Sequence, residues 1–460
     1  MTEAKTKSDQ TSLSLDLQIN NSDLSSLVGP LDSNLAQLEN FLNVEISRRG
    51  ASFGIKGTQA NCRKAIQALT DLAAIAERKS DELTAEDIQL YLVGQNAPAE
   101  ELPAEEPVPE DLKASYRPEE IYFDFELPGS THSLRLSDPF FCQMRHSTEI
   151  AWKGTGSLCI LMDRMVRGDQ CRIYYKPFYT REDFSDERYS PVFSPTVYSG
   201  QTMSLMLYLD QWNGNETPGV APYIRTCHDK KLHIDGYVKL MQHQWIQITF
   251  TIPDTNGDII DEVGIILEGY APSKNKTLGN VYLDEFRISG KAKYTIDPGK
   301  QMKNFASVTP FATDHGAWDL YGGTLNLMRN EPSLACTGNY YAKDYVYSAA
   351  VTPRHGTSHL IGGRILGAKR GYFAGLGKEN KVVIIKNDFG FTTLAEADFP
   401  WNSDTQYQLS LSFTGSQICL SVNGTEVLVA EDDSFDHGMI GCGSCETGRT
   451  SFGEFYFEEH

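Results

Sequence analysis

The chain has 460 residues, a length that predicts two to four domains at roughly 100–200 residues per domain. Hydrophobic residues make up 40% and charged residues 22% of the sequence, which excludes a wholly disordered, collagen-like or membrane-spanning chain. The 61 acidic residues outnumber the 41 lysines and arginines, giving a net charge of -20. This charge opposes non-specific attraction to nucleic-acid backbones, so any RNA contact has to be local.

The opening stretch MTEAKTKSDQTSLSLDLQINN is polar where a signal peptide needs an apolar run. No stretch approaches the roughly 18 apolar residues of a spanning helix, so we expect a cytoplasmic protein without membrane association. The nine cysteines are spread through the chain and are expected to be reduced core residues. Cys442 and Cys445 form a CxxC pair, but a structural zinc site needs a second pair of ligands, so packing within strands is the favoured interpretation.

The N-terminal part, residues 1–94, predicts a small α+β domain. Apolar residues recur at helical spacing in SNLAQLENFL and in TQANCRKAIQALTDLAAIAERK, which indicates two amphipathic helices. Between them VEISRRG and ASFGIKGT alternate as a hairpin would. A last helix is expected at LTAEDIQLYL, where Thr84 is a good N-cap and Asp87 takes the acidic position of a capping box.

Residues 95–117 have the composition of a linker. The segment is rich in Pro, Ala and Glu, and its like charges repel. Because proline favours extended backbone, we expect a semi-stiff, solvated spacer with no core of its own.

After the linker the sequence changes to short runs rich in Val, Ile, Phe, Tyr and Thr, such as EIYFDFEL, SLMLYLDQW and VGIILEGY. Turn signals separate these runs and no useful helical period lies between them, which predicts antiparallel sandwiches. The economical division is two successive β-sandwiches, at residues 118–290 and 303–460. Asn423 and Gly424 predict a two-residue hairpin turn, because both tolerate positive φ.

The stretch LQINNSDLSSLVGPLDSNLAQLENFLNVEISRRGASFGIKGTQANCRKAIQALTDL, followed by ELTAEDIQLYL, resembles the N-terminal KH-like domain of PhoH-family proteins over residues 14–92. In that family a P-loop ATPase follows. Here the nearest glycine-rich string, GYFAGLGKE from Gly371, has the wrong spacing and carries Glu379 where Ser or Thr is required. Nucleotide binding is therefore not expected.

The resemblance implies an alternative function, weak binding of single-stranded RNA. A KH module grips the RNA backbone through a Gly-rich loop between two helices. Gly29-Pro30-Leu31-Asp32 stands at that place, where Pro30 removes an amide donor and Asp32 adds a repelling carboxylate. The candidate RNA-binding residues are Gly29, Arg48, Arg49 and Lys56, although exposed cations are more often a solvated surface.

GNVYLDEFRISG is similar to the closing strand of galactose-binding-like jelly rolls, and YQLSLSFTGSQICLSVNGTEVLVAEDDSFDHGMIGCGS resembles concanavalin-like or laminin-G-like sandwiches. As a tandem, residues 118–460 resemble the non-catalytic C-terminal region of some bacterial ADP-ribosylglycohydrolase-family proteins. The helical hydrolase core of that family has no counterpart in the sequence. The resemblance therefore implies a binding protein, with a related or glycan-acting hydrolase as a further alternative.

A carbohydrate or another hydroxyl-rich ligand needs an aromatic platform together with carboxylates and amides that bond its hydroxyl groups. Mixed clusters of this kind occur in DQWNGNETPG with the residues that follow it, and again near the start of the second sandwich. Sandwich aromatics more often fill the core. The candidate ligand-binding residues are Trp212, Asn213, Glu216, Tyr223, Arg225, Trp318, Asp319 and Arg329.

Asp432, Asp433 and Asp436 in EDDSFDHG could hold Ca²⁺, although an acidic hairpin loop is commoner than a metal loop. No other cofactor is expected and no catalytic residue is assigned. Cleavage of a glycoside would need two carboxylates facing the bond. Adjacent residues such as Asp284 and Glu285 face opposite sides of a strand, and only a distant pair such as Glu268 and Asp284 stays open as an alternative.

Overall fold

The structure is a computed structural model that describes residues 11–17, 19–29, 32–78, 83–84, 87–88, 120–184, 194–270, 278–304, 307–314, 316–328, 331–367 and 370–460. The chain divides into two compact units, Met1–Lys113 and Ala114–His460. The predicted linker at residues 95–117 lies outside the described residues. Within the described residues, no helix is long and apolar enough to cross a membrane.

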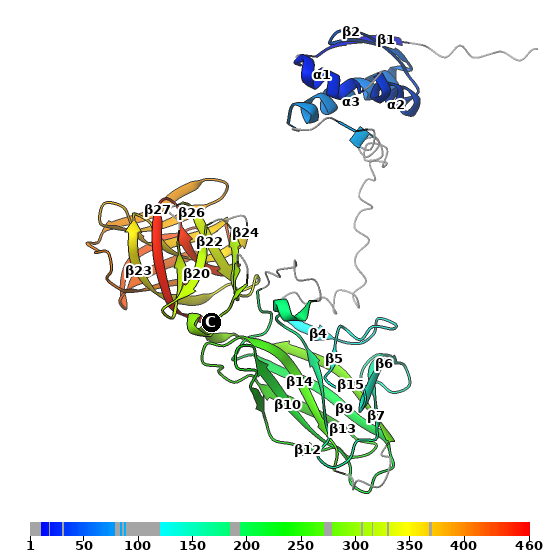
Figure 1. Ribbon diagram of the computed structural model, residues 1–460, viewed down its shortest axis with the longest axis vertical. Coiled ribbons are helices and arrows are strands. Elements are labelled where there is room, and N and C mark those ends of the chain that lie inside the picture. Colours follow the sequence, from blue (N-terminus) through cyan, green and yellow to red (C-terminus); the bar gives the residue numbers. More distant parts are fainter. Residues whose placement is uncertain are drawn as a thin grey trace, which may run out of the picture. The chain divides into compact units, whose positions relative to one another are not determined.

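The N-terminal unit has the predicted α+β composition (Figure 1). Its sheet is antiparallel in the order β1-β3-β2. The elements are β1 (Thr11–Asp16), α1 (Asn21–Val28), α2 (Ser33–Leu42), β2 (Glu45–Arg49), β3 (Ser52–Gly57) and α3 (Gln59–Arg78). The two long amphipathic helices and the hairpin are confirmed, whereas β1 was not predicted. Thr84 and Asp87 make the reciprocal hydrogen bonds of the predicted capping box.

The apolar face of α3 explains how this unit folds. Ala65, Leu69, Leu72 and Ala76 lie three or four residues apart and are all buried. They form one core with apolar side chains of the other two helices and of β3. A stripe at this spacing faces one side of a helix, so a single long helix can cover the small sheet.

The first sandwich consists of two antiparallel sheets (Figure 1). One, the β9 sheet, has the order β13-β9-β15-β7-β6, with β4 beside β15; the other, the β14 sheet, has the order β11-β10-β14-β8-β5, with β12 beside β10. The strands are β4 (Ile121–Phe123), β5 (Arg135–Leu136), β6 (Cys142–Ser147), β7 (Ser157–Asp163), β8 (Gln170–Tyr175), β9 (Thr202–Trp212), β10 (Gly219–Thr226), β11 (Leu232–Ile234), β12 (Val238–Lys239), β13 (Trp245–Thr251), β14 (Ile260–Glu268) and β15 (Leu278–Ser289). A short 3-10 helix, Arg181–Asp183, follows β8.

Alternation along the strands builds the core of this sandwich. In β9, Met203, Leu205, Leu207 and Leu209 are buried and the residues between them are partly exposed. The buried set packs against inward-facing residues of β14 such as Ile265. Successive side chains of a strand point to opposite faces, so the remaining residues of the β9 sheet form a second, outward face.

The second sandwich has the sheet orders β20-β21-β32-β23-β28-β29-β30, with β16 beside β32, and β19-β22-β31-β24-β25-β26-β27. β17 and β18 pair with each other, and a 3-10 helix spans Pro298–Lys300. The strands are β16 (Lys293–Ile296), β17 (Lys303–Asn304), β18 (Ser307–Val308), β19 (Ala312–Asp314), β20 (Trp318–Tyr321), β21 (Thr324–Leu327), β22 (Ser333–Thr337), β23 (Tyr345–Gly356), β24 (His359–Gly367), β25 (Arg370–Gly377), β26 (Lys381–Asn387), β27 (Phe391–Asp398), β28 (Tyr407–Thr414), β29 (Gln417–Val422), β30 (Thr425–Glu431), β31 (Met439–Ser444) and β32 (Gly448–Glu459).

Two details of this sandwich bear on the predictions. Asn423 and Gly424 have φ angles of 51° and 79° and connect β29 to β30, which confirms the predicted hairpin turn. The interval 291–302, which the sequence left outside both sandwiches, contains β16, and this strand pairs with β32 from Lys293↔Glu458 to Ile296↔Phe455.

Candidate functional site

The outward face of the β9 sheet carries a row of aromatic and polar side chains that runs across its strands. Trp245 pairs with Tyr208, Tyr208 with Tyr282, Tyr282 with Cys159, and Cys159 with Arg145. Directly paired residues of an antiparallel sheet lie on the same face. Five residues from five strands therefore form one transverse row, although they span more than a hundred positions of the sequence.

One end of this row is an exposed group of rings, which we call the aromatic cluster: Trp152, Tyr208, His243 and Trp245. The ring centroids of Trp152 and Trp245 are 5.7 Å apart in an edge-on arrangement, and those of Tyr208 and Trp245 are 5.2 Å apart. Trp152 is 52% exposed. Tyr208 and Trp245 belong to strands, and aromatic rings that are open to solvent are a natural surface for apolar C–H groups of a ligand.

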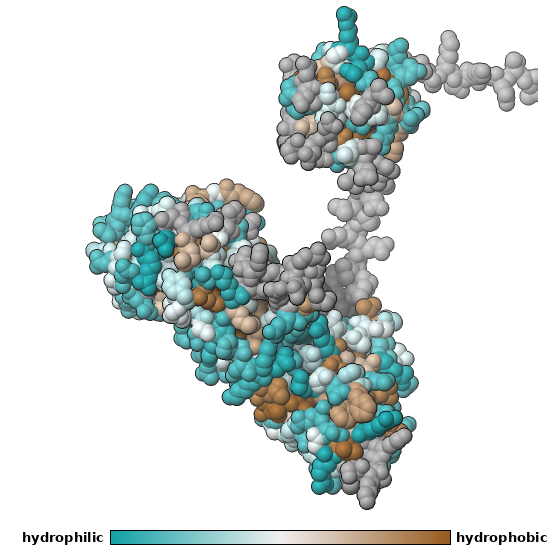
Figure 2. Space-filling view, viewed as in Figure 1, coloured by the Kyte–Doolittle hydropathy of each residue, from teal (hydrophilic) through white to brown (hydrophobic). Residues whose placement is uncertain are grey.

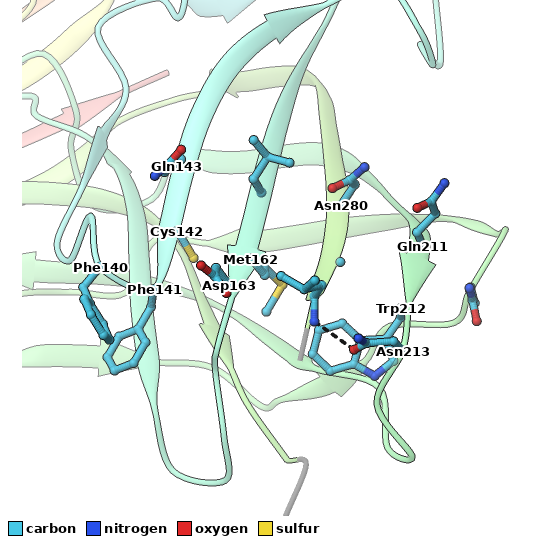
Figure 3. A pocket seen from close by; sticks show the side chains of 14 residues that line it. Phe140, Phe141, Cys142, Gln143, Met162, Asp163, Gln211, Trp212, Asn213 and Asn280 are labelled. Carbon is cyan, nitrogen blue, oxygen red and sulfur yellow. Dashed lines mark hydrogen bonds between the residues drawn. The ribbon is translucent and has the colours of Figure 1, made fainter. Parts of the chain in front are cut away.

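The next row of the same face leads into a groove. Gln143 pairs with Leu161 and Leu161 with Asn280, each two residues along its strand from a member of the first row. The groove has a volume of about 640 Å³ (Figure 3). Its polar lining consists of Gln143, Asp163, Gln211, Asn213, Gln242 and Asn280, and its other lining residues are Phe140, Phe141, Cys142, Leu161, Met162, Trp212, Leu278 and Gly279.

A β-bulge shapes one wall of the groove. Gly279 of β15 opposes Trp212 of β9 and Val281 opposes Leu209, so β9 carries one residue more than β15 between these pairs. A Cβ atom on Gly279 would lie 2.5 Å from the Trp212 ring. The glycine thus allows the indole to lie against β15, at the edge of the groove (Figure 3).

Trp212, a candidate for the aromatic platform, was expected in a turn but lies in a strand. It is the last residue of β9 and only 9% exposed, and its Nε1 donates to the carbonyl oxygen of Glu216 at 2.8 Å. Asn213 lines the groove, and its Oδ1 accepts a hydrogen bond from the backbone N–H of Leu278 at 2.8 Å. The Glu216 carboxylate pairs instead with Arg167 and Lys239. Two of these three predicted residues therefore lie at the groove.

Tyr223 and Arg225 lie on β10, in the other sheet, and are not brought to the groove. The Tyr223 hydroxyl donates to Glu262 at 2.9 Å, and Arg225 pairs with Glu262 at 2.6 Å and with Asp261 at 2.8 Å. Both carboxylates are buried. Burial and the Glu262 carboxylate raise the pKa of Tyr223 well above its ordinary value. This network serves to neutralise buried charge within the β14 sheet.

The predicted site in the second sandwich is not formed. Trp318 is 3% exposed and belongs to the core, where it faces Phe452. Its neighbour Asp319 points the other way and pairs with Lys303 at 2.9 Å. Adjacent residues of a strand face opposite sides, so this pair cannot act together on one ligand. Arg329 lies outside the described residues.

The predicted calcium loop is not assembled either. Lys386 Nζ lies 2.6 Å from one oxygen of Asp432, and the Tyr372 hydroxyl donates to the other at 2.6 Å. Burial alone would raise the pKa of Asp432, but these hydrogen bonds hold it well below its ordinary value. Asp436 pairs with His437, and Asp433 is exposed. In the described ranges no group of three or more acidic, His or Cys side chains is placed to hold a metal ion.

In the N-terminal unit one of the predicted RNA-binding residues, Arg48, is engaged in an ion pair with Asp32. Gly29 ends α1 with a φ of 72°, and Asp32 lies at the start of α2. The Asp32 carboxylate accepts hydrogen bonds from Arg48 at 2.7 and 3.0 Å, so one cation of the predicted surface is already neutralised. Arg49 and Lys56 remain exposed at the ends of β2 and β3.

No family model matches the chain, and no curated protein matches it. Among solved structures, the carbohydrate-binding module CBM66 from Bacillus subtilis aligns over 32% of this chain and 95% of its own, with 21% identity and a TM-score of 0.31. The tandem CBM22-1–CBM22-2 domain of Paenibacillus barcinonensis Xyn10C aligns over 74% and 97%, with 10% identity and a TM-score of 0.24. The Caenorhabditis elegans galectin LEC-6 aligns over 28% and 94%, with 15% identity and a TM-score of 0.23. Identities and TM-scores this low carry no argument about function.

Proposed function

We propose that the chain binds a glycan on the outward face of the β9 sheet. The observation that carries the proposal is the combination of a groove with six amide and carboxylate side chains and, on the same face, an exposed aromatic cluster. Amides both donate and accept hydrogen bonds, as hydroxyl groups do, and aromatic rings contact the C–H face of a sugar. The proposal keeps the predicted ligand class and moves its site to other residues.

Binding rather than cleavage is favoured by the arrangement of the acidic groups near the groove. Asp163 is the only carboxylate among the described residues that line the groove. Glu268 and Asp284, the pair left open by the sequence, lie in different sheets, on β14 and β15. Asp284 already accepts hydrogen bonds from the backbone N–H groups of Trp152 and Lys153. A two-carboxylate cleavage site is therefore not proposed.

The proposal is tested by titrating the full chain with a panel of neutral oligosaccharides in a calorimeter. Asn280→Ala combined with Gln143→Ala removes two amides from the groove floor, and should weaken binding by about tenfold, since each hydrogen bond contributes about 0.5–1.5 kcal/mol. Asn402→Ala, which removes an exposed amide from the second sandwich, is the matched control and should bind as the parent does. Absence of binding across the panel, or equal binding by the groove variant, would overturn the proposal.

RNA binding by the N-terminal unit remains a second proposal, supported by the exposed cations Arg49 and Lys56. It rests on the resemblance to the PhoH-family KH-like domain over residues 14–92.

We also retain the cytoplasm as the proposed compartment. The burial of seven of the nine free cysteines supports it, because buried thiols are the expected form in a reducing environment.

A further inference from the structure

A small cavity lies inside the unit Ala114–His460, where its two sandwiches meet. Ser199, which precedes β9, and Ile260 of β14 line it from the first sandwich. Tyr294 of β16 and Thr337 of β22 line it from the second. The space open to the centre of a water molecule is about 20 Å³. A cavity needs about 10–15 Å³ to hold one water molecule, so this cavity has the room.

Three hydroxyl groups of the cavity wall have no hydrogen-bond partner among the described residues: those of Ser199, Tyr294 and Thr337. Ser199 is 2%, Tyr294 7% and Thr337 1% exposed, so bulk water does not reach them. A Cβ atom on Gly338, the residue after Thr337, would lie 3.1 Å from the Tyr294 hydroxyl oxygen. Buried hydroxyl groups are normally hydrogen-bonded. Three unpaired ones around one cavity therefore indicate a partner that they share.

Other polar groups of the wall are satisfied by the protein itself. The Tyr198 hydroxyl donates to a backbone carbonyl oxygen, and Thr255 Oγ1 donates to the carbonyl oxygen of Asp258 at 2.6 Å. Each oxygen of the Asp258 carboxylate accepts hydrogen bonds from two backbone N–H groups. Because its lone pairs are used in this way, the wall as described offers no free anionic ligand to a cation. The shared partner of the three hydroxyl groups is therefore expected to be neutral.

We propose that the cavity binds an ordered water molecule that joins Ser199 of the first sandwich to Tyr294 and Thr337 of the second. A water molecule donates two hydrogen bonds and accepts two, and each hydroxyl group can donate or accept. One water molecule can therefore satisfy all three hydroxyl groups. It acts as a structural part of the junction between the sandwiches.

The first test is a crystal structure of the full chain at a resolution that shows ordered water. It should contain a water oxygen in the cavity, about 2.5–3.0 Å from each of the three hydroxyl oxygens. The combined variant Ser199→Ala, Tyr294→Phe and Thr337→Val removes the hydroxyl groups and nearly keeps the shape of the side chains, and its cavity should be dry. The parent structure decides the question even if this variant folds poorly.

The second test works in solution. Deuterium magnetic relaxation dispersion of the solvent counts long-lived internal water molecules, and the combined variant should lose at least one relative to the parent. Tyr347→Phe is the matched control, because it removes a buried tyrosine hydroxyl that donates to the carbonyl oxygen of Gly441 at 2.9 Å. The count in this control should stay that of the parent.

Three results would overturn the inference. They are a parent crystal structure that shows ordered water elsewhere but none in the cavity, an ion in the cavity bound by Asp258, and an unchanged count of long-lived water molecules in the combined variant. Because neither measurement needs a sugar, the outcome is independent of the proposed glycan binding.

Discussion

Replacing Trp152 by alanine tests the aromatic cluster directly. Its indole is 52% exposed, whereas its backbone N–H is fixed by the buried carboxylate of Asp284 at 2.8 Å, as is that of Lys153 at 3.0 Å. The main chain at this position is therefore held independently of the ring. Trp152→Ala should therefore remove the surface of the ring, while the backbone N–H groups of residues 152 and 153 keep their hydrogen bonds to Asp284.

The size of the effect follows from the exposed area. An aromatic side chain offers up to about 250 Å², so Trp152 exposes roughly 130 Å², of which a sugar ring would cover about half. At about 25 cal/mol per Å² the lost contact amounts to about 1.6 kcal/mol, or roughly 15-fold in Kd. Loss of the edge-on contact with Trp245 should cost the fold only about 0.5–1.5 kcal/mol.

Calorimetric titration of the full chain with the oligosaccharide that binds the parent best would measure this change. Tyr321→Ala is the matched control, because Tyr321 is 55% exposed but lies on β20 of the second sandwich. Binding by Trp152→Ala within twofold of the parent would refute the role of the aromatic cluster. An equal loss in Tyr321→Ala would refute its location.

Three further predictions concern the rest of the chain. Glu262→Ala should lower the free energy of unfolding, measured in urea, by about 3–5 kcal/mol, because the buried carboxylate binds Arg172, Tyr223 and Arg225. The control Glu268→Ala, on the same strand, should lower it much less. Burial lowers the pKa of His359 to about 4, so below about pH 6.5 the unfolded chain binds a proton that the folded chain does not. The free energy of unfolding should therefore fall by up to about 3 kcal/mol between pH 6.5 and 4. A pH series in which His359→Leu keeps this slope would contradict the prediction. Asp32→Asn should release Arg48 and strengthen single-stranded RNA binding a few-fold at low salt, and an unchanged fluorescence-polarisation titration would count against the RNA proposal.

Local signals in the sequence predicted elements well because those signals act within a few residues. The helical spacing of Leu69, Leu72 and Ala76 predicted α3, and the positive φ tolerated by Asn423 and Gly424 predicted the turn between β29 and β30. β1 was missed because it is a single strand in a polar stretch whose partner, β3, lies some forty positions away. Pairing of that kind leaves no trace in a local window.

The candidate site was predicted less well, because the residues proposed for it come together through strand register. Trp245, Tyr208 and Tyr282 gave signals for strands, but only their pairing shows that they share a face. Trp212 and Trp318 were chosen because polar residues are near them in sequence, and both proved to be buried. The alternation of side chains along a strand could have predicted that Trp318 and Asp319 face opposite sides. No pattern within a few residues could have predicted that Lys386 lies beside Asp432.

The two sheets of the first sandwich differ in how their polar side chains are used. This difference is why we propose that the glycan binds the β9 sheet and expect it to be neutral. On the β14 sheet, Arg172 pairs with Glu262 and Arg225 pairs with both Glu262 and Asp261, so the two positive charges are already met by two carboxylates of the protein. The groove on the β9 sheet is lined mainly by amides, which recognise hydroxyl groups without needing an opposite charge. Asp163 and the net charge of -20 would both repel a polyanion. A sulfated or uronic-acid glycan that bound in the groove more tightly than its neutral counterpart would contradict this reasoning while leaving glycan binding itself intact.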